Sequence, residues 1–180
     1  GIKALAPVFP KLNFMPTGGV NTKNLMDYLG FDRIIACGGT WMVKKDLIEG
    51  EKWDEITRIC KEAVKTMLGF SMAHVGINCA DEAQAEQTTK TLCALFDLEY
   101  KPGNSSIFAG SAVECNKAPV RGANGHIAIG TNNVDRAVYH LGLRGVTFDE
   151  SSRKTDAKGN TKAIYLKDEL AGFAVHLVKE

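Results

Sequence analysis

Two similar stretches place histidines where metal chemistry could occur. Residues 73–85 read AHVGINCADEAQA and residues 125–137 read GHIAIGTNNVDRA, so His74 and His126 occupy matching positions. A second match joins AVECNK at residues 112–117 to AVHLVK at residues 174–179 and aligns Glu114 with His176. Three imidazoles and one carboxylate form an N3O donor set that Zn, Ni, Fe or Mn accepts. We therefore predict a divalent metal site made of His74, Glu114, His126 and His176, and we expect no organic cofactor.

The alternative is a polar pocket without a metal. A single histidine on a strand is more often a hydrogen-bonded core residue than a ligand, and this applies to each of the three taken alone. The repeat favours the metal site, because three of the four histidines occupy repeat-related positions. The fourth, His140, lies within AVYHLGL and is expected on a helix at a surface or interface.

The elements that position these side chains are strands. Side chains alternate along a strand, so His126 shares a face with Ala128, and His74 shares a face with Gly76. These small neighbours leave room for a cavity, and we expect the aliphatic residues of the opposite face to pack beneath helices. Each module then consists of a histidine-bearing strand, a helix (residues 81–97 or 133–145) and several further strands.

Residues 12–67 show a different pattern, in which strands and helices alternate. LNFMPTGGV at residues 12–20 and RIIACGGT at residues 33–40 are typical of strands that end in glycine turns. Helices are expected after each, the first with Asn21 or Thr22 as its N-cap, and a long amphipathic helix over 51–68. Such apolar strands indicate a parallel sheet covered by helices. Two βα units cannot close a sheet, so we expect residues 1–68 to be the end of something larger.

The two glycine turns are candidate anion sites. Each follows a predicted strand and precedes a helical segment, where backbone N–H groups and the helix dipole favour an anion. In a (β/α)8 barrel the loops after the last two strands are the usual phosphate site. Tight turns that need glycine are the alternative. We predict that a small phosphorylated or oxo-acid ligand binds at Thr17, Gly18, Gly19, Gly38, Gly39 and Thr40.

FMPTGGV followed by a helix and then CGGTW resembles the C-terminal end of the 2-keto-3-deoxy-6-phosphogluconate / 4-hydroxy-2-oxoglutarate aldolases. The resemblance covers residues 1–68. It implies the last two βα units of a (β/α)8 barrel in a class I aldolase, a carbon–carbon lyase that releases pyruvate and is typically trimeric. It also assigns the six turn residues to the family's substrate- and phosphate-binding loops.

One residue of that family has no match here. The family's Schiff-base lysine lies on an earlier strand in a segment that contains Phe-Pro, and neither Lys3 nor Lys11 corresponds to it. Class I chemistry needs this amine to form the iminium. We therefore expect the chain alone to be inactive as an aldolase.

HVGIN, VECNKAPVRGANGHIAIGTNNVDRAVYHLGLRGV and GFAVHLV resemble the glyoxalase / vicinal-oxygen-chelate family over residues 72–180. This resemblance implies an α+β domain over residues 69–180, built of two βαβββ modules whose sheets curl around a shared site. The family's four metal positions map onto His74, Glu114, His126 and His176. The last is usually glutamate, so His176 is a departure that removes one negative charge. A histidine could replace the glutamate as a base.

Composition excludes two classes of partner. The net charge is +1 and no run of Lys or Arg is present, so we expect no nucleic acid partner. No apolar run is long enough to span a bilayer, so we expect no membrane contact. Five scattered cysteines without a CxxC pair favour a reduced, cytoplasmic chain. The resemblance to trimeric aldolases favours a homo-oligomer.

Three functional interpretations follow. In the first, the chain is the C-terminal part of an aldolase fused to a glyoxalase-like domain that binds a metal or a ligand. In the second, it is an independent metal-dependent enzyme, similar to glyoxalases or dioxygenases. In the third, residues 69–180 are a non-catalytic binding or oligomerisation module. Metal analysis separates the third from the other two.

Overall fold

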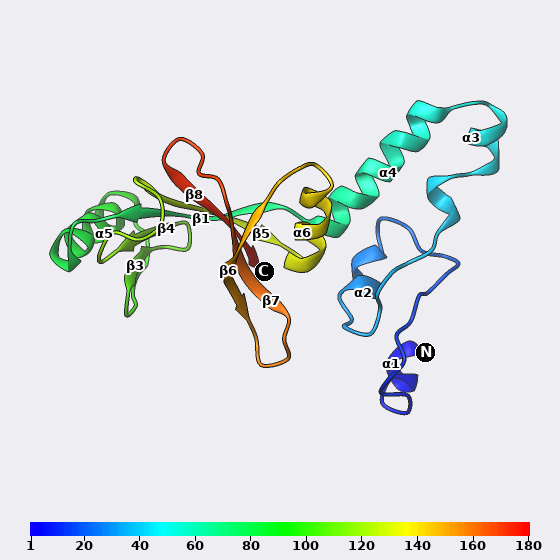
Figure 1. The fold of residues 1–180 in the computed structure, drawn as a ribbon, viewed down its shortest axis with the longest axis horizontal. Coiled ribbons are helices and arrows are strands. Elements are labelled where there is room, and N and C mark those ends of the chain that lie inside the picture. The colour runs from blue at the N-terminus through cyan, green and yellow to red at the C-terminus, as the bar shows by residue number, and fades with distance from the viewer. The chain divides into compact units, whose positions relative to one another are not determined.

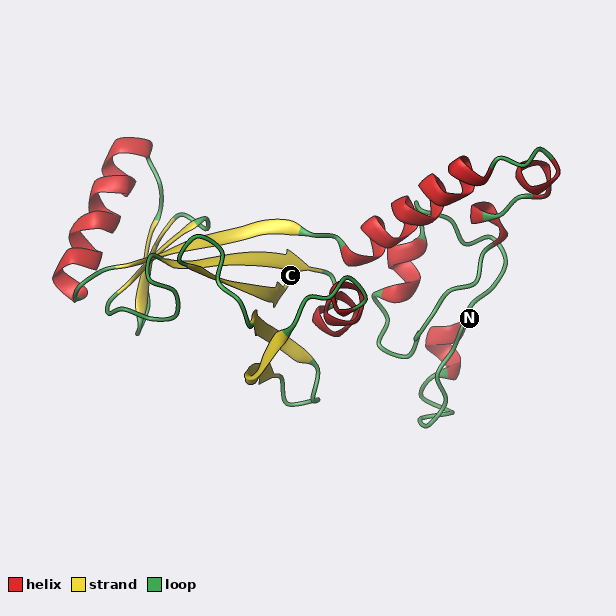
Figure 2. Ribbon diagram, turned by 45° about the horizontal axis from the view of Figure 1, so that its top comes forward, coloured by secondary structure: helices red, strands yellow, loops and turns green.

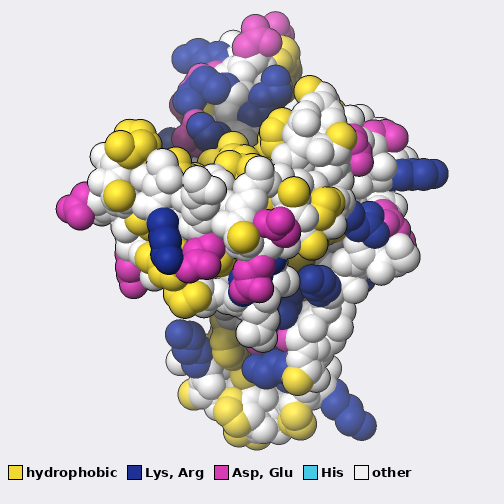
Figure 3. Space-filling model, turned by 90° about the vertical axis from the view of Figure 1, so that its left-hand side faces the viewer, with side chains coloured by type: hydrophobic (Ala, Val, Ile, Leu, Met, Phe, Trp, Pro, Cys, Tyr) yellow, Lys and Arg dark blue, Asp and Glu magenta, His cyan; other side chains and the backbone are white.

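The computed structural model describes all 180 residues and divides into two compact units, Gly1–Gly69 (unit 1) and Phe70–Glu180 (unit 2). Unit 1 contains helices and loops, and unit 2 combines helices with an eight-stranded sheet (Figures 1 and 2). None of the helices has the length and apolar composition that a bilayer crossing requires. Positive and negative side chains are mixed with apolar ones on the side that carries α5 (Figure 3).

Unit 1 is built around a small apolar core. Its helices are α1 (Ile2–Leu5), α2 (Leu25–Leu29), the 3-10 helix η1 (Thr40–Met42), α3 (Lys45–Glu49) and α4 (Trp53–Leu68). The core residues are Val20, Leu25, Leu29 and Ile34, against which Met67 of α4 packs. Helix α4 ends at Leu68 and is capped by Gly69, whose left-handed conformation (φ 57°) favours glycine.

The two strands predicted in unit 1 are reduced to one parallel bridge between Phe14 and Ile34. The side chains next to the bridge remain uncovered, since Met15 is 59% and Ile35 is 63% exposed. A parallel pair of apolar strands normally has neighbours on both edges and helices on both faces. Unit 1 therefore has the predicted parallel direction but does not show a segment of a barrel.

The start of α2 also differs from the sequence prediction. The N-cap is Asn24, because the side chain of Asn21 accepts a hydrogen bond from the N–H of Lys23 and closes a turn ahead of the helix. Asparagine commonly stabilises such turns. The helix consequently begins a few residues later than the Asn21 or Thr22 cap predicted.

Unit 2 consists of two βαβββ modules, as the resemblance to the vicinal-oxygen-chelate family implies. The first contains β1 (Ser71–Asn78), α5 (Glu82–Phe96), β2 (Tyr100–Pro102), β3 (Ser106–Ala109) and β4 (Val113–Asn116). The second contains β5 (Gly125–Thr131), α6 (Val134–Gly142), β6 (Phe148–Thr155), β7 (Thr161–Leu166) and β8 (Phe173–Lys179). The sheet order is β2-β3-β4-β1-β5-β8-β7-β6, so the second module reverses the order of the first.

The modules meet where β1 pairs antiparallel with β5. His74 lies opposite Ala128, and Gly76 lies opposite His126. Because His74 and His126 are repeat-equivalent, as are Gly76 and Ala128, exchanging the two modules leaves this pairing unchanged. An irregularity between Met72 and His74 interrupts the register on one side only.

Matching caps start the two module helices. The Asp81 side chain accepts a hydrogen bond from the N–H of Gln84 at 2.8 Å, and the Asn133 side chain accepts one from the N–H of Arg136 at 2.9 Å. Both are side-chain caps of the kind expected at a helix N-terminus. The repeat therefore extends from the strands to the way in which each helix begins.

The helices cover the outer strands of their modules. Helix α5 packs on β2, β3 and β4, and α6 packs on β7 and β8. The prediction that the aliphatic residues of the two central strands pack beneath helices is wrong for Ile77, which is 36% exposed, because neither helix lies over the β1–β5 pair. The side chains buried between helix and sheet come from other positions: Ala85 of α5 with Ile107 and Cys115 in the first module, and Ala137 of α6 with Ile164 and Leu177 in the second.

Candidate metal centre

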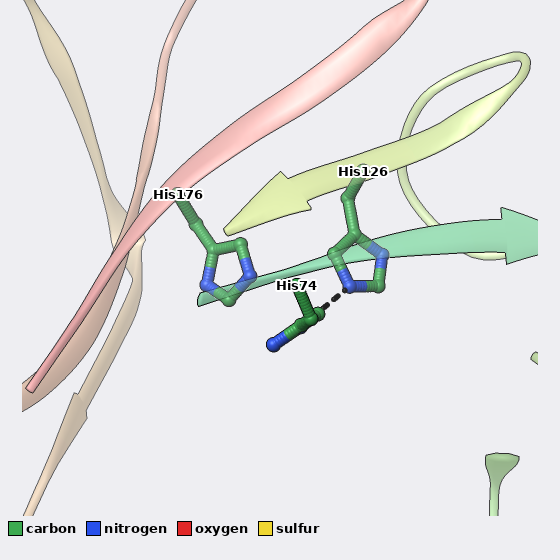
Figure 4. Close-up of side chains that lie close together, drawn as sticks. All are labelled: His74, His126 and His176. Carbon is green, nitrogen blue, oxygen red and sulfur yellow. Dashed lines mark hydrogen bonds between the residues drawn. The ribbon is translucent and has the colours of Figure 1, made fainter. Parts of the chain in front are cut away.

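Three histidines from three strands point toward one another on the face of the sheet opposite the helices. His74 lies on β1, His126 on β5 and His176 on β8 (Figure 4). One ring nitrogen from each lies within 4.8 Å of those of the other two. His126 is 4% exposed and His176 is 8% exposed, so the cluster is largely buried.

The strand register explains why Glu114 joins the cluster. In the parallel β1–β4 pair Glu114 lies opposite Gly76, and in the parallel β5–β8 pair His176 lies opposite Ala128. Both modules therefore deliver a polar side chain next to a small residue of the central strand. These small residues leave space for the side chains beside them.

The polar atoms of the first three groups form a tight triangle. The Oε2 atom of Glu114 is 3.0 Å from Nε2 of His126 and 3.3 Å from Nε2 of His74, and the two Nε2 atoms are 3.2 Å apart. Ligands that bind one metal at about 2.1 Å are separated by about 3.0 Å in an octahedral arrangement and about 3.4 Å in a tetrahedral one. The triangle thus has the dimensions of one face of a metal coordination shell.

Hydrogen bonds keep Glu114 ionised. Burial raises the pKa of its carboxyl group, but hydrogen bonds from His126, His74 and Ser106 outweigh burial and hold the pKa well below its usual range. The Ser106 hydroxyl donates to Oε1 at 2.5 Å and leaves Oε2 to face the histidines. Glu114 is therefore an anionic group with one oxygen held in place.

His176 is a buried imidazole whose two nitrogens, Nδ1 and Nε2, have no hydrogen-bond partner. The Nδ1 atom of His126 also lacks a partner. Burial, followed by the neighbouring His126 and His74, lowers the pKa of His176 to about 4. At neutral pH the ring is uncharged and offers a lone pair, which is the state that binds metals.

Two aromatic rings flank the histidines at repeat-equivalent positions. Phe108 lies opposite Glu114 and Tyr165 lies opposite His176 in the antiparallel pairs of their modules. The Phe108 ring meets His74 edge-on at 5.5 Å, and the Tyr165 ring stacks on His176 at 4.7 Å. Sequence reasoning missed Ser106, Phe108 and Tyr165, and only an alignment of the short strands of the two modules could have indicated the two aromatic residues.

The glycine turns of unit 1 lie beside each other. The N–H of Gly38 donates to the carbonyl of Pro16, and a Cβ added at Gly38 would be 2.9 Å from the Thr17 methyl group. Gly18 and Gly19 both have positive φ angles, so their conformations favour glycine. At Gly39 an added Cβ would overlap the ring of Trp41. Backbone conformation at Gly18 and Gly19 and close neighbours at Gly38 and Gly39 therefore account for these glycines without a ligand.

Thr40, the last of the predicted anion-site residues, lines a surface hollow. The same hollow, with a volume of about 730 Å³, is lined by Lys44 and Lys45 and also by the carboxylates of Asp46 and Glu49. Lys45 pairs with Glu49 at 3.4 Å, so the lining has mixed charge. Lys3 lies in the short helix α1 and Lys11 in an exposed turn, so neither lies on a strand.

Residues 1–59 match the family described as KDPG and KHG aldolase. The chain is 48% identical over 63 residues to the 2-dehydro-3-deoxy-phosphogluconate aldolase of Haemophilus influenzae, a match that covers 35% of this chain and 30% of that protein. It is 38% identical over 68 residues to the KHG/KDPG aldolase of Escherichia coli K12, covering 36% and 32%. The chain thus spans about a third of the length of the curated relatives it matches.

Solved structures align with a larger part of the chain. A hypothetical protein, BH1468 from Bacillus halodurans, aligns with a TM-score of 0.45 and 13% identity over 62% of this chain and 95% of its own. The methylmalonyl-CoA epimerase of Streptomyces coelicolor aligns with a TM-score of 0.44 and 19% identity over 61% and 94%. The architecture of unit 2 rests on its own element order and strand register. The chain therefore joins an N-terminal segment that matches the KDPG and KHG aldolase family in sequence to a unit of two βαβββ modules.

Proposed function

We propose that unit 2 binds one divalent metal ion through His74, Glu114, His126 and His176, and that this centre binds a small oxo acid. The observation that carries the proposal is His176, a buried imidazole with two unpartnered nitrogens beside the other three groups. A buried polar group normally has a partner, because leaving it without one costs about 1–3 kcal/mol. A metal at this place would provide that partner.

The donor set also fits a metal better than it fits a hydrogen-bonded network. Nε2 of His74, Nε2 of His126 and Oε2 of Glu114 are mutually close, and a carboxylate oxygen can accept from both rings only if both Nε2 atoms carry protons. Both N–H groups would then converge on one oxygen, with their nitrogen atoms only 3.2 Å apart and no hydrogen bond between the two rings. Replacing both protons by one cation removes the conflict. An N3O set with a single carboxylate suits Zn, Ni, Fe or Mn.

The residues of the chain have separate roles in this proposal. A bound metal would supply Lewis acidity that polarises a ligand oxygen. Ser106 orients Glu114, and Tyr165 holds the plane of the His176 ring by stacking. Gly76 leaves the space that the His126 ring occupies. Because the His176 pKa of about 4 keeps that ring neutral near pH 7, its lone pair is available to the metal rather than to a proton.

For unit 1 we propose an aldolase-derived role without aldolase chemistry in this chain alone. The match over residues 1–59 supports an origin in the C-terminal part of a 2-dehydro-3-deoxy-phosphogluconate / 4-hydroxy-2-oxoglutarate aldolase. The adjacent turns around Thr17 and Gly38, with Thr40 near Lys44, are the proposed phosphate-binding region. No lysine matches the Schiff-base position of the family. The remaining barrel strands and a homo-oligomer would be needed for activity.

Metal analysis of the purified 180-residue chain tests the first proposal. After loading with Zn²⁺ and removal of excess metal, elemental analysis should find about one ion per chain. His126→Ala should abolish this binding. His140→Ala is the matched control, because His140 lies on α6 outside the cluster, and it should bind as the unaltered chain does. A folded chain that binds no metal, or equal losses in both variants, would support the metal-free pocket instead.

Borohydride trapping tests the second proposal. An aldolase lysine forms an iminium with pyruvate, which borohydride reduces to a stable adduct that mass spectrometry detects. The chain should gain no adduct and should release no pyruvate from the aldol substrate. A stoichiometric adduct on one lysine would overturn the assignment and identify a reactive amine in this chain.

A further inference from the structure

Two cationic side chains lie near the metal-centre residues but belong to neither the donor set nor its hydrogen bonds. Arg121 lies in the segment between β4 and β5, and Lys154 lies on β6. The proposed function gives neither residue a role. Lys154 belongs to the second module, as do His176 and Tyr165, and Arg121 lies in the segment that precedes this module.

Arg121 is held in place from both sides. The side-chain amide of Asn78 donates to the carbonyls of Val120 and Gly122, and its oxygen accepts from the N–H of Val120. The Arg121 guanidinium group lies over the Tyr165 ring, 5.0 Å from the centroid. Since Tyr165 stacks on His176, only the Tyr165 ring separates Arg121 from the proposed metal ligand His176.

Arg121 keeps donors available for a ligand. Its Nη1 atom pairs with Oδ2 of Asp149 at 2.7 Å, which uses only part of a group with five N–H donors. Its side chain is 48% exposed, so solvent and ligands can reach the guanidinium group. The Asp149 contact therefore fixes the orientation of the group without occupying it.

Lys154 lies on the same face of the sheet as the three histidines of the cluster. It pairs directly with Ala163 on β7, and Ala163 is two residues from Tyr165, which pairs with His176. Residues directly opposite in an antiparallel pair, and residues two apart in one strand, lie on the same face. Lys154 is exposed and forms no ion pair in the structure. Its charge is close enough to contribute to the lowered pKa of His176.

We propose that Arg121 and Lys154 bind a second anionic group of the ligand, at the end remote from the metal-binding oxygens. The observation behind this inference is the distance between Arg121 and the histidines. The Tyr165 ring lies between Arg121 and His176, so an anion bound by Arg121 belongs to a part of the ligand distant from the chelating atoms. The ligand class is an oxo acid with a distal carboxylate or phosphate. This inference rests on the proposed function, because the histidine centre holds the other end.

A pair of probes isolates the distal charge. 2-Oxoglutarate and 2-oxopentanoate have the same 2-oxo-carboxylate end, and only the first has a distal carboxylate. Calorimetric titration of the metal-loaded 180-residue chain should show about tenfold tighter binding of 2-oxoglutarate, the size expected for a hydrogen bond to a charged group. Arg121→Gln and Lys154→Gln should each reduce this preference while leaving the affinity for 2-oxopentanoate within about twofold.

Lys162→Gln is the matched control. Lys162 is also exposed, but it lies next to Ala163 on β7, so its side chain leaves the opposite face of the strand. It should retain the full preference. Equal binding of both probes by the unaltered chain would overturn the inference. So would a loss in the Arg121 variant that is equal for both probes, because that result indicates a structural role.

The metal-free chain separates this inference from the proposed function. There, the Tyr165 ring resonances in an NMR titration report directly on anion binding beside Arg121. A preference for 2-oxoglutarate that depends on Arg121 would support the cationic subsite even if the chain bound no metal. If metal binds but neither form of the chain distinguishes the probes, the subsite is wrong and the metal centre remains.

Discussion

Gly76→Ala tests most directly how the strand register builds the histidine cluster. A Cβ added at Gly76 would lie 2.1 Å from Cε1, 2.4 Å from Nδ1 and 2.5 Å from Nε2 of His126. Non-bonded carbon atoms are in favourable contact at about 3.5–4.0 Å, so the ring would have to move by more than about 1 Å. The obstacle is a methyl group attached directly to the backbone of β1, which cannot turn aside.

That displacement is large compared with what a metal centre tolerates. Metal–ligand distances stay within about 0.2 Å of their ideal values, so the moved Nε2 atom of His126 could no longer bind with the other ligands in place. We expect the Zn²⁺ affinity to fall by about 100-fold or more, which a competing chromophoric chelator measures. Overpacking should also destabilise the metal-free chain by about 1–3 kcal/mol in urea unfolding.

Gly142→Ala is the control for a glycine-to-alanine change. A Cβ added at Gly142, in α6, meets no atom within 4 Å. Alanine is the better helix former by up to about 1 kcal/mol, so this variant should be as stable as the unaltered chain or more so, with unchanged metal affinity. A Gly76→Ala chain with normal metal affinity would refute the reasoning, since His126 could then not lie against Gly76.

Three further predictions concern single groups of unit 2. Ser106→Ala removes the donor to Oε1 of Glu114 and should weaken Zn²⁺ binding by about 10–100-fold, whereas exposed Ser105→Ala should not, as chelator competition will show. The metal-free chain should lose stability as the pH falls from 6.5 toward 4: the folded pKa of His176, about 4, is below its unfolded value of 6.5, so the unfolded state binds the proton first. The loss approaches about 3 kcal/mol in urea unfolding and should be absent in His176→Gln. Ile164→Ala, at a fully buried position beneath α6, should cost about 2–5 kcal/mol by the same method; a smaller cost would mean that the core of the second module can collapse around the gap.

Much of the polar cluster could be predicted from the sequence, because alternation along a strand and a repeat are both local signals. These signals brought His74, His126, Glu114 and His176 to one face before any strand pairing was known. The partner of Glu114 was not predictable in this way. Ser106 meets Glu114 because β3 pairs with β4 in one particular register, and that register depends on the turn between them rather than on any local pattern.

The helix positions show a second limit of local reasoning. Alternation correctly separated the two faces of β1 and β5 but could not say which strands the helices cover. Because α5 and α6 pack on the outer strands, Ile77 keeps much of its exposure. In unit 1 the pattern predicted two strands from residues that form a single bridge at Phe14 and Ile34, since local sequence does not supply the neighbours that a parallel pair requires.

The matched register of the two modules has a consequence for engineering. Position 176 corresponds to Glu114, and position 163 corresponds to Ser106, yet the second module carries His176 and Ala163 there. The two modules thus differ at both positions together: the first pairs the acid Glu114 with the hydroxyl of Ser106, and the second pairs the imidazole of His176 with the methyl group of Ala163. Introducing a glutamate at position 176 alone would create a buried carboxylate without its donor. A symmetric two-carboxylate centre would require the serine at position 163 to be installed together with it.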